Sequence, residues 1–291
     1  MSELPNRAAR TADPGDFPLP RRPRDSHKGD YGRLFILAGS RGYTGAAALC
    51  ARAAVRSGAG LVTLAVPEDV YPVLAAKCCD EVMVWPMRSD NRAVLDKAKG
   101  ATAAVIGPGL GQGERAERLA LALMRELMCP IILDADGLNI ISRHIDVLDE
   151  RAGDTVLTPH DGEFARLSGC TLPITERLGA ARGFAQAHRC TLVLKGHRTV
   201  TAYPNGDCVV NPTGNPGMAT GGSGDVLAGL LGALMAQGRY GLPVHGAVWL
   251  HGRAGDLAAA DKGEYGMTPS DLIEQIPYAI KELTNNEEES K

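Results

Sequence analysis

Several signatures of common enzyme classes are missing from this chain of 291 residues. It contains no Gly-x-Gly-x-x-Gly segment and no Gly-Lys dipeptide, which excludes the Rossmann fingerprint and the P-loop. Gly-x-Ser-x-Gly and His-Glu-x-x-His are absent as well, which argues against a serine hydrolase or a zinc protease. No apolar stretch reaches the roughly 18 residues that span a bilayer, so we expect no membrane as a partner.

Excess positive charge is also missing. Lys and Arg number 31 against 34 Asp and Glu, a net charge of −3, so no global field exists to hold nucleic acid, and we expect none as a partner. The seven cysteines form no Cys-x-x-Cys pair and show no zinc-ligand spacing, and we interpret them as small buried hydrophobic residues. Their odd number and the lack of a secretory apolar segment predict a reducing, cytoplasmic location.

From residue 33 onward, short apolar runs alternate with longer stretches of helical period. The runs are nearly continuous in Val, Ile, Leu and Ala, as in parallel strands that are covered on both faces. We predict strands that start at Arg33, Leu61, Ala103, Ile131, Thr155 and Thr191, and a hairpin around Asn205-Gly206. The predicted helices include one capped by Thr44, one over 114–127, and three that begin near Asp225, Pro243 and Pro269.

This alternation predicts an α/β fold of three layers, with a mostly parallel central sheet and helices on both faces. We predict an extended N-terminal arm over residues 1–26, one domain over 27–283 and a charged C-terminal tail over 284–291. A division into two domains is the weaker alternative. Open parallel sheets bind ligands at the carboxyl ends of their strands, so we expect the chemistry at that edge.

The strongest functional signal is the segment 219-ATGGSGDVLAG, in which glycines lead into a helix of small residues. The backbone amides of Gly222, Ser223 and Gly224 at the helix start are suited to an anion such as a phosphoryl group. Asp225 follows directly, and the helix dipole would favour its ionised form, as a base that accepts a hydroxyl proton during phosphoryl transfer requires. The alternative is that Asp225 only caps the helix.

The Gly-Ser-Gly-Asp element resembles the Gly-x-Gly-Asp sequence of the ribokinase-like kinases, which builds an anion hole beside a catalytic Asp. A more specific resemblance covers the chain from about Ser26 to the last helix. It rests on six ordered motifs: 39-GSRGYTGAA, 107-GPGLG, 133-LDADGLN, 157-LTPHDGE, 194-LKGHRT and 214-GNPGMATGGSGDVLAG. In this order they resemble the ADP/ATP-dependent NAD(P)H-hydrate dehydratases, which implies a ribokinase-like fold.

The resemblance implies a role for each matched residue. Asp225 would be the catalytic base that faces the substrate hydroxyl, and Gly222, Ser223 and Gly224 would form the anion hole. The nucleotide would be bound by Lys195, Gly196, His197, Arg198, Thr199 and Gly224. The reduced nicotinamide substrate would be bound by Ala46, Gly109, His160 and Asp225.

A magnesium site is also implied. Glu163 occupies the acidic position that organises magnesium-bound water in many ribokinase-like enzymes, whereas His160 replaces their usual Asn. Asp134 and Asp136 follow a predicted strand and either support the metal or substrate or cap the next helix. Structural alternatives exist for His160, as a helix N-terminal residue bonded to a turn, and for Lys195, as a solvated strand end.

The implied reaction is the dehydration of hydrated NADH or NADPH, with Mg²⁺ and with ADP or ATP as phosphoryl donor. The ring hydroxyl would be phosphorylated and phosphate would then leave. Two alternatives stay open: a kinase of a vitamin-precursor alcohol, such as a pyrimidine or thiazole, and a non-catalytic nucleotide-binding scaffold. The motifs leave no segment for a second catalytic domain, so we expect a separate NAD(P)H-hydrate epimerase to act upstream. The resemblance also suggests a homo-oligomer, such as a tetramer.

Overall fold

The computed structural model describes residues 8–289 and contains one mixed sheet, in the order β1-β10-β9-β8-β7-β6-β5-β2-β3-β4. From β8 to β4 every pair of neighbouring strands is parallel, whereas β9 runs antiparallel to β8 and β10. The strands are β1 Arg10–Thr11, β2 Arg33–Leu37, β3 Leu61–Pro67, β4 Val82–Met87, β5 Ala103–Ile106, β6 Ile131–Leu133, β7 Thr155–Leu157, β8 Thr191–Leu194, β9 Val200–Ala202 and β10 Cys208–Val210.

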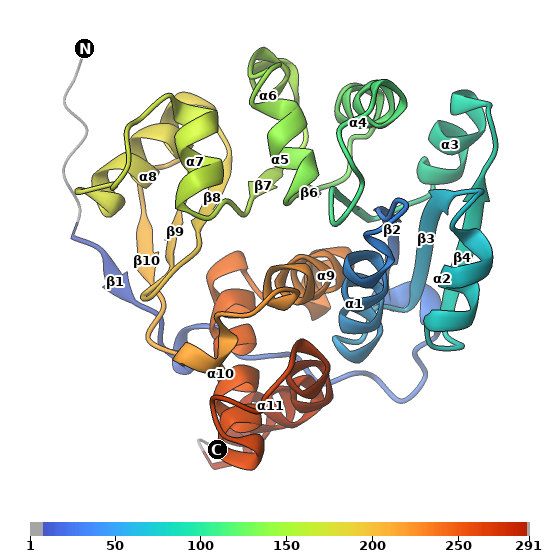
Figure 1. The fold of residues 1–291 in the computed structure, drawn as a ribbon. Coiled ribbons are helices and arrows are strands. Elements are labelled where there is room, and N and C mark those ends of the chain that lie inside the picture. Colours follow the sequence, from blue (N-terminus) through green and yellow to red (C-terminus); the bar gives the residue numbers. More distant parts are fainter. Residues whose placement is uncertain (1–7, 290–291) are drawn as a thin grey trace.

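Helices cover both faces of the sheet (Figure 1). On one face lie α1 Thr44–Arg56, α2 Tyr71–Lys77, α9 Ser223–Ala236, α10 Val244–Lys262 and α11 Pro269–Glu289. On the other lie α3 Asn91–Ala98, α4 Glu114–Glu126, α5 Asp136–Ile141, α6 Asp146–Glu150, α7 Asp161–Ser168 and α8 Arg177–Ala187. Among the residues that the structure describes, no helix combines the length and apolarity needed to cross a bilayer.

The two faces of the sheet have separate apolar cores. Along β2, Leu34 and Ile36 pack toward α1 and α9, whereas Phe35 and Leu37 pack toward α3 and α4. Because successive side chains of a strand point to opposite faces, a strand that is buried on both sides must be apolar at every position. This explains the continuous apolar runs of the sequence, and the predicted three-layer α/β fold is confirmed.

Helix α9 packs against the sheet and against α1, which lies beside it on the same face. A Cβ atom on Gly229 would lie 2.0 Å from the carbonyl oxygen of Cys50 in α1, and one on Gly232 would lie 2.5 Å from the side chain of Val105 in β5. The two glycines therefore let the helix approach both neighbours closely. This approach places the first turn of α9 at the carboxyl ends of the central strands.

Several local predictions need correction. Strand β4, which contains Pro86, and the two-residue strand β1 were not predicted. The N-cap of α1 is Tyr43 rather than Thr44, which is already helical. Of the seven free cysteines, only Cys50, Cys190 and Cys208 are buried, and the others are half-exposed.

The predicted terminal segments are described only in part. Residues 1–7 of the predicted arm lie outside the described residues, and its remainder includes β1, which pairs with β10. Helix α11 extends through Glu289 into the predicted charged tail, of which residues 290–291 also lie outside the described residues.

Candidate active site

The loops that carry the sequence motifs meet where the strand order changes direction. From β2 the chain adds β3 and β4 on one side, whereas β5 to β8 follow on the other side. The helices that follow β2 and β5, α1 and α4, lie on opposite faces of the sheet, and such a change of direction at the carboxyl edge is the usual ligand position in these sheets. Gly109 lies in the loop after β5, and Ala46 lies in the first turn of α1, which follows β2.

Close backbone contacts join these two loops. A Cβ atom on Gly109, whose φ is +59°, would lie 3.1 Å from the Cβ of Ala46 and 2.7 Å from the carbonyl oxygen of Tyr43. The Ser40 hydroxyl donates a hydrogen bond of 2.8 Å to the carbonyl of Gly109. The structure thus brings together Ala46 and Gly109, and a larger residue at position 109 would separate the loops.

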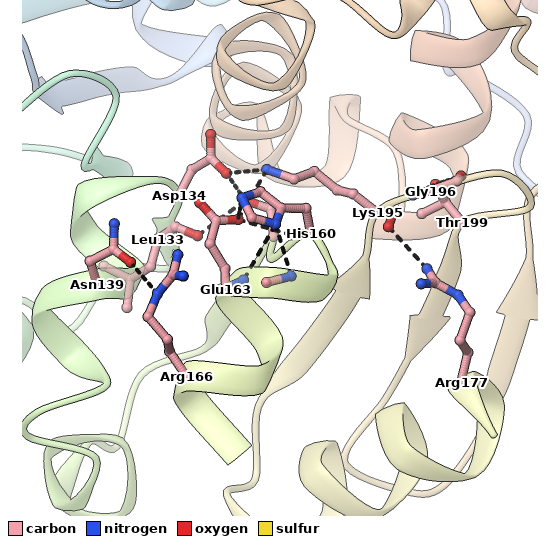
Figure 2. A network of polar contacts seen from close by, with 12 residues as sticks. Leu133, Asp134, Asn139, His160, Glu163, Arg166, Arg177, Lys195, Gly196 and Thr199 are labelled. Atoms are coloured by element: carbon pink, nitrogen blue, oxygen red, sulfur yellow. Dashed lines mark hydrogen bonds and ion pairs between the residues drawn. The ribbon is translucent and has the colours of Figure 1, made fainter. Parts of the chain in front are cut away.

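The polar centre of the site is formed by Asp134 after β6, Glu163 in α7 and Lys195 after β8 (Figure 2). The Lys195 Nζ lies 2.7 Å from Asp134 Oδ1 and 3.7 Å from Glu163 Oε2. The Thr158 hydroxyl donates to the same Asp134 oxygen over 2.8 Å. Burial alone would lower the pKa of Lys195, but the carboxylates of Asp134 and Glu163 outweigh it and raise that pKa above its usual value. Lys195 is therefore a charged ammonium within the site rather than a solvated strand end.

His160 is the N-cap of α7. Its Nδ1 accepts hydrogen bonds from the amides of Gly162 at 3.0 Å and Glu163 at 3.3 Å, while Glu163 Oε2 accepts from the His160 amide at 2.8 Å. This reciprocal capping box means that Nδ1 carries no proton. The helix-capping alternative for His160 is thus realised, and the exposed remainder of the ring faces the same site (Figure 2).

The first turn of α9 completes the site. Gly222 is its N-cap with φ +108°, and Ser223 is buried. The His251 Nε2 lies 3.0 Å from the Ser223 carbonyl, and burial lowers the pKa of His251 to about 4, so this ring is neutral and donates to the carbonyl. A Cβ atom on Gly224 would lie 3.3 Å from the Lys195 Nζ, so the helix start and the ammonium are neighbours.

The pKa of Asp225 differs from the value that the sequence led us to expect. Burial is the main cause that raises its pKa to about 7, the charge of Asp134 raises it further, and Lys195 opposes both. The helix dipole was expected to favour the ionised form, but desolvation and neighbouring carboxylates have the larger effect. Asp225 is consequently a carboxyl group that exchanges its proton near neutral pH.

The segment from Lys195 to Thr199 is a tight turn between β8 and β9. The Thr199 hydroxyl donates a hydrogen bond to the Gly196 carbonyl at 2.9 Å. The Arg177 side chain stabilises the turn by donating to the Lys195 carbonyl at 2.9 Å. His197 and Arg198 are exposed. Only Lys195 of this segment enters the polar centre, so its other residues form a rim beside it.

The residues of the site fit a magnesium ion that is coordinated mainly by oxygen atoms of a bound phosphate compound and of water. Among the charges that act most strongly on Asp225, those of Asp134, Asp136 and Glu163 are negative and only that of Lys195 is positive. A site with this excess of carboxylates favours a hard cation. Within the described part of the chain, no cluster of three or more His, Cys, Asp or Glu side chains could hold a metal alone. Mg²⁺ usually combines one or two carboxylates with phosphate oxygens and water, which agrees with this arrangement.

Three residues of the site were not predicted as functional: Thr158, Arg177 and His251. Thr158 belongs to the quoted motif 157-LTPHDGE, which was the available signal. Arg177 and His251 come from α8 and α10, and no local pattern marks either of them. Asp136, in contrast, was expected near the site, and it accepts hydrogen bonds from the Gly111 amide at 2.8 Å and the Gln112 side chain at 3.1 Å.

The fold is that of the ribokinase-like proteins. A ribokinase-like superfamily protein from Enterococcus faecalis superimposes with a TM-score of 0.82 and 29% identity, over 97% of this chain and 99% of that one. Residues 34–278 match the NAD(P)H-hydrate dehydratase family, and the chain belongs to that family.

Individual relatives agree with this family assignment. The ADP-dependent (S)-NAD(P)H-hydrate dehydratase of Neisseria meningitidis is 38% identical over 91% of this chain and 88% of its own length. The ADP/ATP-dependent NAD(P)H-hydrate dehydratase of Bacillus subtilis, co-crystallised with ATP and Mg²⁺, shares 32% identity with a TM-score of 0.78, over 91% of this chain and 95% of that one. The chain spans about half the length of other curated relatives, such as the bifunctional NAD(P)H-hydrate repair enzyme of Moorella thermoacetica, with 43% identity over 91% of this chain and 52% of the relative.

Proposed function

We propose that the protein dehydrates hydrated NADH or NADPH in a reaction driven by ADP or ATP. The observation that carries the proposal is the placement of Asp225 in the first turn of α9, beside the Lys195 ammonium and the Asp134 carboxylate. The relative from N. meningitidis bears the name of this activity, and the chain covers most of its length.

In the proposed mechanism, Asp225 accepts the proton of the ring hydroxyl. The hydroxyl oxygen then bonds to the terminal phosphorus of the nucleotide, and the bond from that phosphorus to the bridging oxygen breaks. In the second step the carbon–oxygen bond breaks and phosphate leaves with the electron pair. Loss of an adjacent ring proton restores the double bond, so the cofactor loses the elements of water and the hydroxyl oxygen leaves in the phosphate.

The chain's own residues hold the nucleotide and the transferred group. The amides of Gly222, Ser223 and Gly224 would meet the negative charge of that group, a contribution of about 3–4 kcal/mol for one donor in other enzymes. Gly196, His197, Arg198 and Thr199 would border the nucleotide, and His160 would border the nicotinamide.

Magnesium would be held by nucleotide phosphates and by water that Glu163 orients. When bound, it would neutralise phosphate charge during the transfer. The B. subtilis relative was crystallised with ATP and Mg²⁺, and the excess of carboxylates in this site supports the same requirement here.

The test supplies the purified protein with hydrated NADH, magnesium and ADP or ATP. We expect recovery of dihydronicotinamide absorbance together with release of one phosphate per cofactor repaired. Only one epimer should react directly, so recovery should slow at a plateau until an epimerase is added. A vitamin-precursor kinase would instead form a stable phosphorylated pyrimidine or thiazole alcohol, and a non-catalytic scaffold would consume no nucleotide.

We also infer that an NAD(P)H-hydrate epimerase acts upstream of this reaction, since relatives that the chain matches bear the name of a bifunctional NAD(P)H-hydrate repair enzyme. The free state of all seven cysteines supports a reducing compartment, the cytoplasm. The proposed homo-oligomer is tested by sedimentation, in which a species of 30.6 kDa alone would contradict it.

A further inference from the structure

Lys195 turns inward from the end of β8 instead of extending into solvent. Its side chain is 19% exposed, and its Nζ is 2.7 Å from an oxygen of Asp134, whose side chain is 1% exposed. Glu163 Oε2 lies 3.7 Å away, beyond hydrogen-bond distance. An ammonium has three donors, so the contact with Asp134 leaves hydrogen-bonding capacity unused.

The position of this ammonium is electrostatically unusual. It lies beside the N-terminus of α9, where a Cβ atom on Gly224 would be 3.3 Å from the Nζ. The N-terminus of a helix carries a partial positive charge, so a cation there is unfavourable unless an anion lies between the two. Asp134 Oδ2, which would be 3.8 Å from the same Cβ atom, offsets part of this positive charge. The ammonium and the first turn of α9 are thus close enough together to contact one bound anion.

The backbone around Lys195 is anchored without its ammonium. The Lys195 amide donates to the Pro159 carbonyl at 2.8 Å, and Arg177 donates to the carbonyls of Leu194 at 3.1 Å and Lys195 at 2.9 Å. The turn therefore does not need the Nζ contact for its shape. The buried Asp134, in contrast, accepts a hydrogen bond from the ammonium (Figure 2) and another from the Thr158 hydroxyl, which fixes the position of its carboxylate.

We propose that the Lys195 ammonium contacts the phosphoryl group that is transferred, and that Asp134 and Thr158 are its positioning residues. The proposal rests on the proposed function and deepens it, because Lys195 was expected only to bind the nucleotide. In this role, the ammonium and the amides of the anion hole together stabilise the negative charge that grows on the phosphoryl group during transfer.

The test compares Asp134→Asn with the double variant Lys195→Met/Asp134→Asn. Removal of Lys195 alone would leave a buried carboxylate unpaired and would destabilise the fold, so the double variant removes both charges together. The matched control is Lys99→Met/Asp96→Asn, which deletes an exposed pair of 2.9 Å between α3 and its C-cap. Thermal unfolding verifies that each variant folds.

We expect the double variant to turn over about 10²–10³-fold more slowly than Asp134→Asn, with an unchanged magnesium requirement and near-unchanged KM for the hydrate. Its affinity for AMP should be retained, whereas its affinity for ADP, which carries the transferred group, should fall. The surface control should match the parent protein. Equal turnover of the double variant and Asp134→Asn, or equal losses of AMP and ADP affinity, would overturn the proposal.

The nucleotide measurements separate this proposal from the proposed function. They need no hydrate, so the ADP-specific loss can be observed even with a different acceptor substrate. If the parent protein leaves the hydrate unchanged but the ADP-specific loss occurs, the proposed function fails and the role of Lys195 stands.

Discussion

Asp225 owes its chemistry to its surroundings. Burial and the charge of Asp134 raise its pKa to about 7, while the nearby ammonium of Lys195 limits the increase. A general base is most effective when its pKa is close to the working pH, because it is then both available and basic enough to accept a proton. The environment that makes this carboxyl group costly to ionise is thus the one that suits it to proton transfer.

The first prediction concerns Asp225→Asn. We expect turnover to fall about 10²–10⁴-fold, because the amide cannot accept the hydroxyl proton, while nucleotide affinity stays nearly intact. In the parent protein, kcat/KM should rise with pH to a plateau with an apparent pKa near 7. Steady-state kinetics and isothermal titration measure both. Near-normal turnover of the Asn variant would exclude Asp225 as the base.

The second prediction concerns the pH dependence of stability. Because the folded-state pKa of Asp225 lies above its ordinary value of 3.8, the folded state holds this proton more tightly than the unfolded state. The associated stability is complete below pH 3.8 and is lost as the pH rises through about 7. At pH 8, the free energy of unfolding of Asp225→Asn should therefore exceed that of the parent protein by about 2 kcal/mol, after allowance for partial solvent screening.

Denaturant unfolding of the nucleotide-free protein at pH 5 and pH 8 measures this difference. The advantage of the Asn variant should be smaller at pH 5 than at pH 8. The opposite trend would mean that the folded state ionises Asp225 more readily than the unfolded chain.

At the scale of elements, apolar continuity made the buried parallel strands predictable. Strands β2, β3, β5, β6, β7 and β8 are apolar at nearly every position because both faces of the sheet are covered. Strand β4 lies at an edge of the sheet and contains Pro86, a combination that weakens the strand pattern. The two residues of β1 form a strand only because β10 lies beside them, which no local sequence window can indicate.

The third prediction uses two helical glycines with different surroundings. Gly229→Ala in α9 would direct a methyl group to 2.0 Å from the Cys50 carbonyl oxygen, so α1 and α9 must separate, at a cost of about 1–3 kcal/mol. Gly183→Ala in α8 meets no atom within 4 Å and should stabilise the protein by about 0.5–1 kcal/mol. Thermal or denaturant unfolding of both variants measures the contrast. Equal effects would show that α9 does not depend on close approach to α1.

At the scale of the whole molecule, the site is built from loops that are far apart in sequence. The motifs at Ala46, Gly109, His160, Lys195 and Asp225 were visible because each places glycines or polar residues after an apolar run. Which side chains touch could not be predicted, because contacts depend on strand order: β6, β7 and β8 are neighbours and so bring together Asp134, Thr158 and Lys195. The support that His251 gives to the first turn of α9 depends on helix packing in the same way.

The central claim is that the substrate hydroxyl is phosphorylated and leaves as phosphate. Hydrated NADH whose ring hydroxyl carries oxygen-18 tests this directly, in a reaction with magnesium and unlabelled ADP or ATP followed by mass spectrometry of the phosphate. Because the oxygen bonds to phosphorus before the carbon–oxygen bond breaks, each phosphate formed with a restored cofactor should contain one oxygen-18 atom. Restored cofactor with unlabelled phosphate, and the label in water, would contradict the mechanism.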